Sequence, residues 1–333
     1  MTANRNLKRR VRARAARTGE SYTAALRHFR PTPPGDDMSE TKTLRLAVAQ
    51  TRLRQNPGDG DELRASGGDV RALLREAHDA GARVVHFPEG AMCSPHKHVM
   101  SADGPDRVGP ARWDRFDWDV HRRELAATAE LAGELGLWVV LGAVHRLTEP
   151  RRPHNSLYVI SDRGRVATRY DERLLSNTKI THMYTPGSAP VTFEADGMRF
   201  GLALGMEVHF PEVFLEYERL DVDCVLFSTA GPGKADVGDV FALEARAHAA
   251  TNSFWVGYSG PAQDSANAPS GVISPDGQWV ARGPRDGERA LVVADLRKDP
   301  DDPARPWRRT ARSGVYTPHL AHDDARSGDR RAF

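Results

Sequence analysis

Short apolar runs recur along the chain from Thr43 onward, and glycine, proline or aspartate residues bound most of them. Runs of this kind are typical of strands that are buried within a sheet. The predicted strands are Leu44–Gln50, Arg83–Phe87, Leu137–Gly142, Asn155–Ile160, Val166–Tyr170, Phe200–Gly205, Asp223–Ser228, Phe254–Ser259, Ser270–Ser274 and Ala290–Leu296.

Stretches of helical periodicity separate these strands. Val70–Ala80 is one of them, since its leucine and alanine side chains fall on one face. Helices are also predicted over Val120–Leu135, from Phe210 to about Leu220, and over Asp239–Ala250. The order of strand, helix and strand along the chain favours an α/β domain built from βαβ-like units.

The N-terminal segment has a different composition, with nine lysines and arginines and one glutamate in its first 30 residues. A helix is predicted over Asn6–Thr18, and a second helix follows Ser21 and ends before the linker Pro31–Asp37. Clustered arginines neutralise phosphates, so residues 5–30 could bind nucleic acid. A solvated tail, or an arm that docks on the body or on a partner subunit, would explain the same charge.

We therefore expect three parts: a basic arm with its linker (1–42), a main domain (43–298) and a polar tail (299–333).

The composition, 39% apolar and 28% charged, is that of a soluble globular protein. Cys93 and Cys224 are the only cysteines, which excludes a disulfide framework and a four-cysteine zinc site. No apolar run approaches the roughly 20 residues of a membrane span, and no signal peptide is recognisable. We expect a cytoplasmic protein.

The stretch Arg199–Glu212 combines a buried strand, a tight turn at Met206–Glu207 and a helix that opens with Phe210 and Pro211. Proteins with buried sheets often present a nucleophile at such a strand-to-helix turn. The stretch resembles the signature of the nitrilase, or carbon–nitrogen hydrolase, superfamily of amidases, nitrilases and carbamoyl hydrolases. The matching positions are Gly201, Leu204, Gly205, Met206, Glu207, Phe210, Pro211 and Glu212.

The resemblance fails at the nucleophile, because the family's cysteine coincides with Gly205, which has no side chain. The strand that ends at Phe87 leads into Pro88–Glu89–Gly90, and the resemblance implies that Glu89 is the general base. The family's catalytic lysine coincides with Glu172. A glutamate at that position opposes both thiolate formation and oxyanion stabilisation.

Seven residues beyond Glu172, where relatives often carry a second glutamate, this chain has Lys179. One interpretation is that lysine and glutamate have been exchanged within one pocket, and the other is that both are ordinary loop charges. The candidate site consists of Glu89, Glu172, Lys179, Gly205 and Glu207.

The resemblance extends over roughly Thr43–Lys298 and implies a four-layer α-β-β-α sandwich, in which helices cover two central sheets. It also implies a closing hairpin, with Ser270–Ser274 and Ala290–Leu296 on either side of Pro275–Asp276–Gly277. Family members commonly form homo-oligomers, so we expect one here. Neither a metal nor an organic cofactor is implied.

The polar loop Cys93–Pro110 carries His96 and His98, but no carboxylate or cysteine at suitable spacing completes a metal site. This loop is therefore expected to line the mouth of the pocket. The loop Gly231–Gly238 is a second segment that would determine ligand specificity.

Three functions remain open. The first is a pocket with a degenerate catalytic triad, non-catalytic or strongly altered, that binds a small amide- or nitrile-like ligand. The second is a divergent amidase- or nitrilase-type hydrolase in which Glu89 activates water, or in which Lys179 assists Cys93 or Ser94 as a substitute nucleophile. The third is binding of nucleic acid or a partner through the basic arm.

Overall fold

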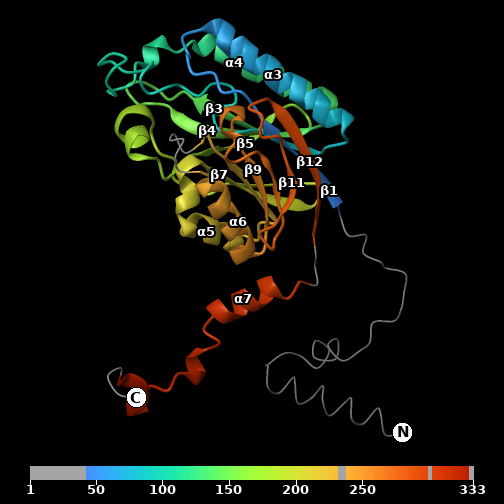
Figure 1. Cartoon of the computed structure of the whole chain (residues 1–333), viewed down its shortest axis with the longest axis vertical. Helices are drawn as coiled ribbons and strands as arrows, with labels where there is room; N and C mark the ends of the chain where they lie inside the picture. Colours follow the sequence, from blue (N-terminus) through green and yellow to red (C-terminus); the bar gives the residue numbers. More distant parts are fainter. Residues whose placement is uncertain (1–42, 232–237, 299–301, 330–333) are drawn as a thin grey trace. The chain divides into compact units, whose positions relative to one another are not determined.

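The computed structural model describes residues 43–231, 238–298 and 302–329 (Figure 1). Its strands form two six-stranded sheets. The first sheet has the order β12 (Ala290–Arg297), β1 (Thr43–Gln50), β2 (Val84–His86), β3 (Trp138–His145), β4 (His154–Ile160) and β5 (Val166–Asp171). The second has the order β11 (Trp279–Arg282), β10 (Gly271–Ile273), β9 (Trp255–Ser259), β8 (Cys224–Ser228), β7 (Met198–Leu204) and β6 (Thr192–Ala195).

The centre of each sheet is parallel and its margins are antiparallel. Strands β1, β2 and β3 run parallel in the first sheet, as do β7, β8 and β9 in the second. Since parallel strands end at the same edge of a sheet, residues that directly follow them are brought close together. Gly205 and Ala230 follow β7 and β8 of the second sheet, whereas Glu89 follows β2 of the first. Because the two sheets pack against each other, these three distant parts of the sequence meet.

Helices cover the outer face of each sheet, which confirms the predicted four-layer sandwich (Figure 1). Helices α3 (Gly60–Asp79) and α4 (Trp118–Leu135) pack on the first sheet, while α5 (Pro211–Arg219) and α6 (Val240–Asn252) pack on the second. The inner faces of the sheets share one apolar core, to which Leu46, Phe200 and Leu226 contribute. Burial of these side chains, each worth about 1.5–3 kcal/mol, stabilises the packed pair of sheets.

The predicted closing hairpin is wrong. Strand β10 turns at Gly277 (φ +79°) into β11, whereas β12 crosses to the first sheet and pairs antiparallel with β1. Trp279–Arg282 was not predicted as a strand because it is only four residues long, which is too short for an apolar pattern to stand out. The edge strand β6 was missed for the same reason.

Helix α3 begins ten residues before the predicted start at Val70. The side chain of Asp59 caps it by accepting hydrogen bonds from the backbone N–H groups of Asp61 and Glu62. Gly67 lies where α3 crosses α4, and a Cβ there would collide with the Glu124 carboxylate. Gly67 lowers the helical propensity of this segment, and it also permits the close helix crossing.

The remaining described elements are short. The segment beyond residue 301 contains α7 (Ala304–Arg312), η6 (Thr317–His319) and α8 (Ala325–Gly328), and the other single turns are η1 (Trp113–Arg115), η2 (Lys179–Met183), η3 (Gly205–His209) and η5 (Ala262–Asp264). Among the described residues, no helix is both long and apolar enough to cross a bilayer. The predicted basic helices before residue 43, and most of the loop Gly231–Gly238, lie outside the described residues.

Candidate functional site

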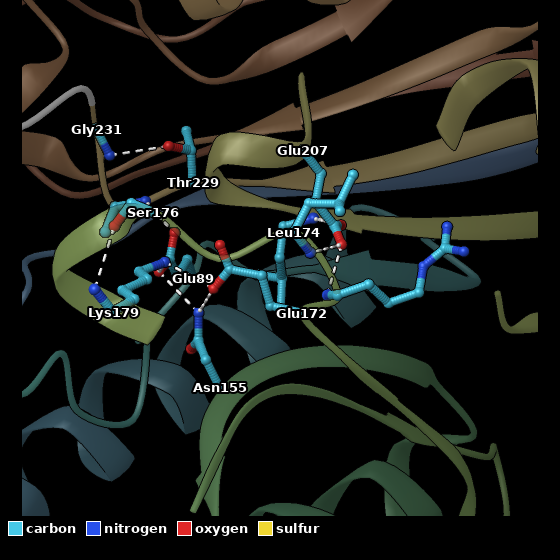
Figure 2. Close-up of polar contacts among 12 residues, drawn as sticks. Glu89, Asn155, Glu172, Leu174, Ser176, Lys179, Glu207, Thr229 and Gly231 are labelled. Atoms are coloured by element: carbon cyan, nitrogen blue, oxygen red, sulfur yellow. Dashed lines mark hydrogen bonds and ion pairs between the residues drawn. The ribbon is translucent and has the colours of Figure 1, made fainter. Parts of the chain in front are cut away.

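Four of the five predicted site residues meet at the edge where the parallel strands end. Glu89 comes from the turn after β2, and Glu172 directly follows β5. Lys179 opens η2, a single turn of π-helix, and Gly205 directly follows β7. Figure 2 shows the side chains of Glu89, Glu172 and Lys179 pointing toward one another. The interpretation of Glu172 and Lys179 as unrelated loop charges is therefore wrong.

Lys179 bridges the two carboxylates. Its Nζ lies 2.5 Å from Glu89 Oε1 and 2.8 Å from Glu172 Oε2. Asn155 Nδ2 donates to the same two oxygens, at 2.9 Å and 2.6 Å (Figure 2). One ammonium and one amide thus hold two carboxyl groups side by side. We call Glu89, Asn155, Glu172 and Lys179 the polar cluster.

Burial strongly shapes the electrostatics of the polar cluster. Glu172 is 0% exposed, and burial raises its pKa to about 8, with the neighbouring Glu89 acting in the same direction and Lys179 opposing. Burial disfavours the charge of Lys179, but the attraction of Glu172 and Glu89 outweighs it and raises the pKa of the ammonium. Lys179 therefore stays protonated, while Glu172 retains its proton to near neutral pH.

Gly205 packs directly against the polar cluster. A Cβ on this glycine would lie 2.9 Å from Glu172 Oε1, 3.0 Å from Glu89 Oε2 and 3.1 Å from Lys179 Nζ. The backbone of Gly205 is also left-handed (φ +50°), a conformation that L side chains rarely adopt. The polar cluster thus occupies the space that a side chain at position 205 would need.

One oxygen of the polar cluster is unsatisfied. Glu172 Oε1 is buried, faces Gly205 and accepts no hydrogen bond from the described residues. A buried polar atom without a partner typically costs about 1–3 kcal/mol. The raised pKa of Glu172 agrees with this environment, since a neutral carboxyl group tolerates burial better than a carboxylate.

Glu207, the fifth predicted residue, has different contacts. Its buried carboxylate accepts hydrogen bonds from Tyr170 Oη at 2.6 Å, Arg173 N at 2.7 Å and Leu204 N at 2.8 Å. These contacts tie the turn after β7 to the segment after β5. Glu207 is therefore a positioning residue that fixes the backbone next to Gly205 and Glu172.

A cavity of about 280 Å³ opens onto the polar cluster. Glu89, Lys179 and Gly205 form its inner end, and Ser94 lies on its wall. Further lining residues are Gln55, Pro95, His96, Lys97, Ser176, Thr178, Met183, Tyr184, Met206, Ala230, Gly231 and Phe241. The loop Cys93–Pro110 contributes Ser94 to Lys97, as the sequence predicted for a pocket mouth.

Sequence reasoning missed two groups that hold Glu89 in place. Asn155 bridges the two glutamates, and Ala230 N–H donates to Glu89 Oε2 at 3.0 Å. A polar residue in an otherwise buried strand could have drawn attention to Asn155. Ala230 acts through its backbone, so its side chain type carries no signal.

Within the described part of the chain, no group of three or more His, Cys, Asp or Glu side chains is arranged to hold a metal ion. The rings of His96 and His98 stack with their centroids 5.4 Å apart, and His98 Nδ1 contacts the carbonyl oxygen of Pro105. These contacts account for the two histidines as parts of the folded loop.

Comparison with known proteins matches this chain to one family model and to two hydrolases. The family model described as carbon-nitrogen hydrolase matches residues 45–300. The proteins Hydrolase MT0498 and Hydrolase Rv0480c of Mycobacterium tuberculosis are each 28% identical to this chain over 282 residues, covering 77% of this chain and 90% of their own length.

Solved structures of similar fold include an amidase of the nitrilase superfamily from Nesterenkonia and a glutamine-dependent NAD⁺ synthetase from Acinetobacter baumannii. The amidase, in a mutant with cysteine changed to alanine, gives a TM-score of 0.61 at 19% identity and covers 84% of this chain and 98% of its own. The synthetase gives a TM-score of 0.60 at 17% identity and covers 78% of this chain and 46% of its own. These likenesses concern the fold.

Proposed function

The chain belongs to the carbon–nitrogen hydrolase family, and from this premise we propose that it binds a small molecule in the family's pocket without thiol-based hydrolysis. The observation that carries this proposal is the position of Gly205. It lies at the centre of Glu89, Glu172 and Lys179, where the resemblance places the nucleophilic cysteine. A glycine there supplies no attacking atom, and loss of the nucleophile typically removes most of a catalytic unit's rate enhancement.

Neither cysteine of the chain is available as a replacement. Cys93 is buried in an apolar cluster with Leu63, Phe116 and Val144, and burial raises the pKa of its thiol. Cys224 is buried inside β8, where burial also raises the pKa. Because the thiolate is the reactive form, both thiols are inert in these surroundings. This argues against the hypothesis that Cys93 is a substitute nucleophile.

The charges of the polar cluster also argue against family chemistry. A catalytic cation stabilises a developing oxyanion only if its charge is directed at the reacting atoms. Lys179 is instead paired with both Glu89 and Glu172, and its exposed fraction at the cavity is small. Glu172 occupies the position of the family's lysine. An anionic tetrahedral intermediate would therefore meet little net positive charge.

The pocket nevertheless retains features suited to binding. Gln55, Ser94, Thr178 and Tyr184 line it, and no hydrogen bond joins any of their side-chain polar atoms to another described residue. Its volume of about 280 Å³ is close to the lower end of the range for small-molecule sites, roughly 300–1,000 Å³. A small amide-like molecule would match these hydrogen-bonding groups.

The test combines binding with turnover. A panel of small amides, nitriles and carbamoyl compounds is screened by thermal shift, and ammonia release is measured in parallel for the wild type and for Glu89→Gln. We expect saturable stabilisation by at least one amide and no enzymatic ammonia release. Ammonia release by the wild type that Glu89→Gln abolishes would overturn the proposal.

A second candidate function is hydrolysis with Ser94 as the substitute nucleophile. The observation in its favour is that Ser94 lines the same cavity as Glu89, whereas Cys93 does not. If ammonia is released, Ser94→Ala distinguishes the two remaining routes. Loss of release in this variant supports attack by serine, and unchanged release supports direct attack by water activated by Glu89.

A further inference from the structure

Another cavity, of about 260 Å³, lies between the segment that leads into α4 and the connection from β3 to β4. Its lining comes from the stretches 111–118 and 146–153, both of which the structure describes without a gap. It shares no lining residue with the cavity at the polar cluster. We call it the tryptophan–arginine cavity, after the residue types that dominate its lining.

Two tryptophans give the tryptophan–arginine cavity an apolar wall. Trp113 and Trp118 are each partly buried, and their ring centroids are 6.1 Å apart. Trp113 Nε1 donates a hydrogen bond to Met183 O at 2.9 Å, and Trp118 Nε1 donates to Trp113 O at 3.3 Å. Because both indole N–H groups are bonded within the protein, the rings offer the cavity π surface rather than hydrogen-bond donors.

The two acidic residues of the lining are already paired with arginines. Asp114 accepts hydrogen bonds from Arg112 Nε at 2.9 Å and from Arg112 Nη2 at 2.6 Å. Glu149 Oε1 lies 3.5 Å from Arg146 Nη2, and the Arg146 guanidinium lies over the Trp118 ring, 5.3 Å from its centroid. The charges of Asp114, Glu149 and Arg146 are therefore balanced locally.

Two further arginines of the lining, Arg151 and Arg152, form no ion pair with a described residue. Arg152 is held by neutral groups, since its Nη1 donates to Thr181 O at 2.6 Å and its Nη2 donates to Ile180 O at 2.7 Å. A guanidinium that binds two carbonyl oxygens keeps its positive charge and still has unused N–H donors. The cavity thus combines two positive charges with an aromatic wall.

We propose that the tryptophan–arginine cavity binds a small aromatic phosphate monoester, with its ring against Trp113 and Trp118 and its phosphate at Arg151 and Arg152. A phosphate monoester carries about 1.5–2 negative charges near neutral pH and matches two guanidinium groups, whereas a carboxylate carries only one. Arginine N–H groups also match the spacing of phosphate oxygens. The volume is slightly below the roughly 300–1,000 Å³ of typical small-molecule sites, which favours a ligand with a single ring.

Arg151 is the residue to change in a test, because Arg152 has a structural contact as well. Arg152 and Trp113 both bind carbonyl oxygens of η2, the turn that opens with Lys179. Loss of Arg152 would disturb this turn and the polar cluster with it. The side chain of Arg151 is exposed, and no contact joins it to another described residue. Arg151→Met therefore removes a charge without removing a contact that stabilises the fold.

The test measures binding to the full-length protein by isothermal titration calorimetry at low salt. The probes are phenyl phosphate, benzoate, which has the ring but a single charge, and inorganic phosphate, which lacks the ring. We expect phenyl phosphate to bind about two- to tenfold more tightly than either, the range for one exposed ion pair or one aromatic contact. Arg151→Met should weaken the binding of phenyl phosphate by about two- to fivefold.

Arg115→Met is the matched control. Arg115 is an exposed arginine of η1 that forms no ion pair with a described residue and does not line the cavity. This variant should bind phenyl phosphate as tightly as the wild type. An equal loss in both variants, or no loss in Arg151→Met, would overturn the proposed site.

Two results for the wild type would also overturn it: phenyl phosphate that binds no more tightly than inorganic phosphate, and the absence of detectable binding. Neither result bears on the proposed function, because the amide panel tests the cavity at the polar cluster separately.

Discussion

The position of Gly205 leads to a specific prediction for Gly205→Cys, the change that restores the cysteine of the family signature. We expect this variant to remain without robust amidase activity. The new Cβ would lie 2.9 Å from Glu172 Oε1 and 3.0 Å from Glu89 Oε2, so the polar cluster must shift to admit it. The left-handed backbone at φ +50° adds conformational strain.

The loss of stability follows from two terms. A non-glycine residue in the left-handed region costs about 1 kcal/mol or more, and overpacking of a buried site typically costs about 1–3 kcal/mol. Together they predict that the free energy of unfolding falls by about 2–4 kcal/mol. Gly205→Ala introduces the same Cβ and the same strain without a thiol, so it separates this structural effect from the chemistry.

The chemical barrier is electrostatic. A thiolate about 4 Å from an ionised Glu172 would be destabilised by about 4 kcal/mol at an effective dielectric constant of 20, which corresponds to about three pKa units. Where Glu172 keeps its proton, the repulsion disappears, but Glu89 still offsets the charge of Lys179. In neither case does the thiol meet the net positive charge that would lower its pKa.

The assay measures ammonia release from a panel of amides, and the pH dependence of iodoacetamide alkylation gives the pKa of the new thiol. We expect a pKa above the ordinary value of about 8.5 for cysteine. The triple variant Gly205→Cys, Glu172→Lys, Lys179→Glu should lower this pKa and give detectable turnover. Strong activity in Gly205→Cys alone, or a thiol pKa near neutrality, would refute the electrostatic reasoning.

Three further predictions concern the same groups. Lys179→Met leaves Glu89 and Glu172 buried without their cation and should lower the free energy of unfolding by about 3–5 kcal/mol in urea titration; a loss below about 1 kcal/mol would contradict this. Because the pKa of Glu172 is raised from 4.5 to about 8 in the folded state, its contribution to stability is present below pH 4.5 and is lost as the pH rises to about 8. Glu172→Gln should therefore flatten the decline in unfolding free energy across this range, and an unchanged slope would exclude the titration of Glu172 as its cause. Tyr170→Phe removes one donor from the buried Glu207 and should destabilise the protein by about 1–3 kcal/mol by thermal denaturation, with a neutral effect contradicting the positioning role of Glu207.

The motif resemblance located the site more fully than the apolar pattern located the strands. It placed Glu89, Glu172, Lys179 and Gly205 in one pocket, and the structure brings these four together. Their functional roles stay predictions. The resemblance succeeded because these residues lie just after a strand or at the start of a helical turn. At such positions, the motif spacing fixes how far each residue lies from the preceding strand.

The features that were missed depend on long-range contacts. The pairing of β12 with β1 joins residues about 250 positions apart, and no local pattern in Ala290–Arg297 specifies that partner. Asn155 acts by bridging two carboxylates from different segments, which only the assembled fold reveals. Glu207 belongs to the motif, yet its carboxylate binds backbone N–H groups, and sequence does not show in which direction a side chain points.

The pairing of the first and last strands of the main domain has a consequence for biosynthesis. One edge of strand β1 is hydrogen-bonded to β12 in the folded protein. During synthesis, β12 leaves the ribosome only after all the residues between the two strands have been made. At about 5–20 residues per second, the interval between Gln50 and Ala290 lasts on the order of 10–50 seconds. During that time β1 presents an unpaired strand edge, the kind of surface on which nascent chains aggregate. The edge of β1 therefore stays open to intermolecular pairing for most of the time in which the domain is synthesised.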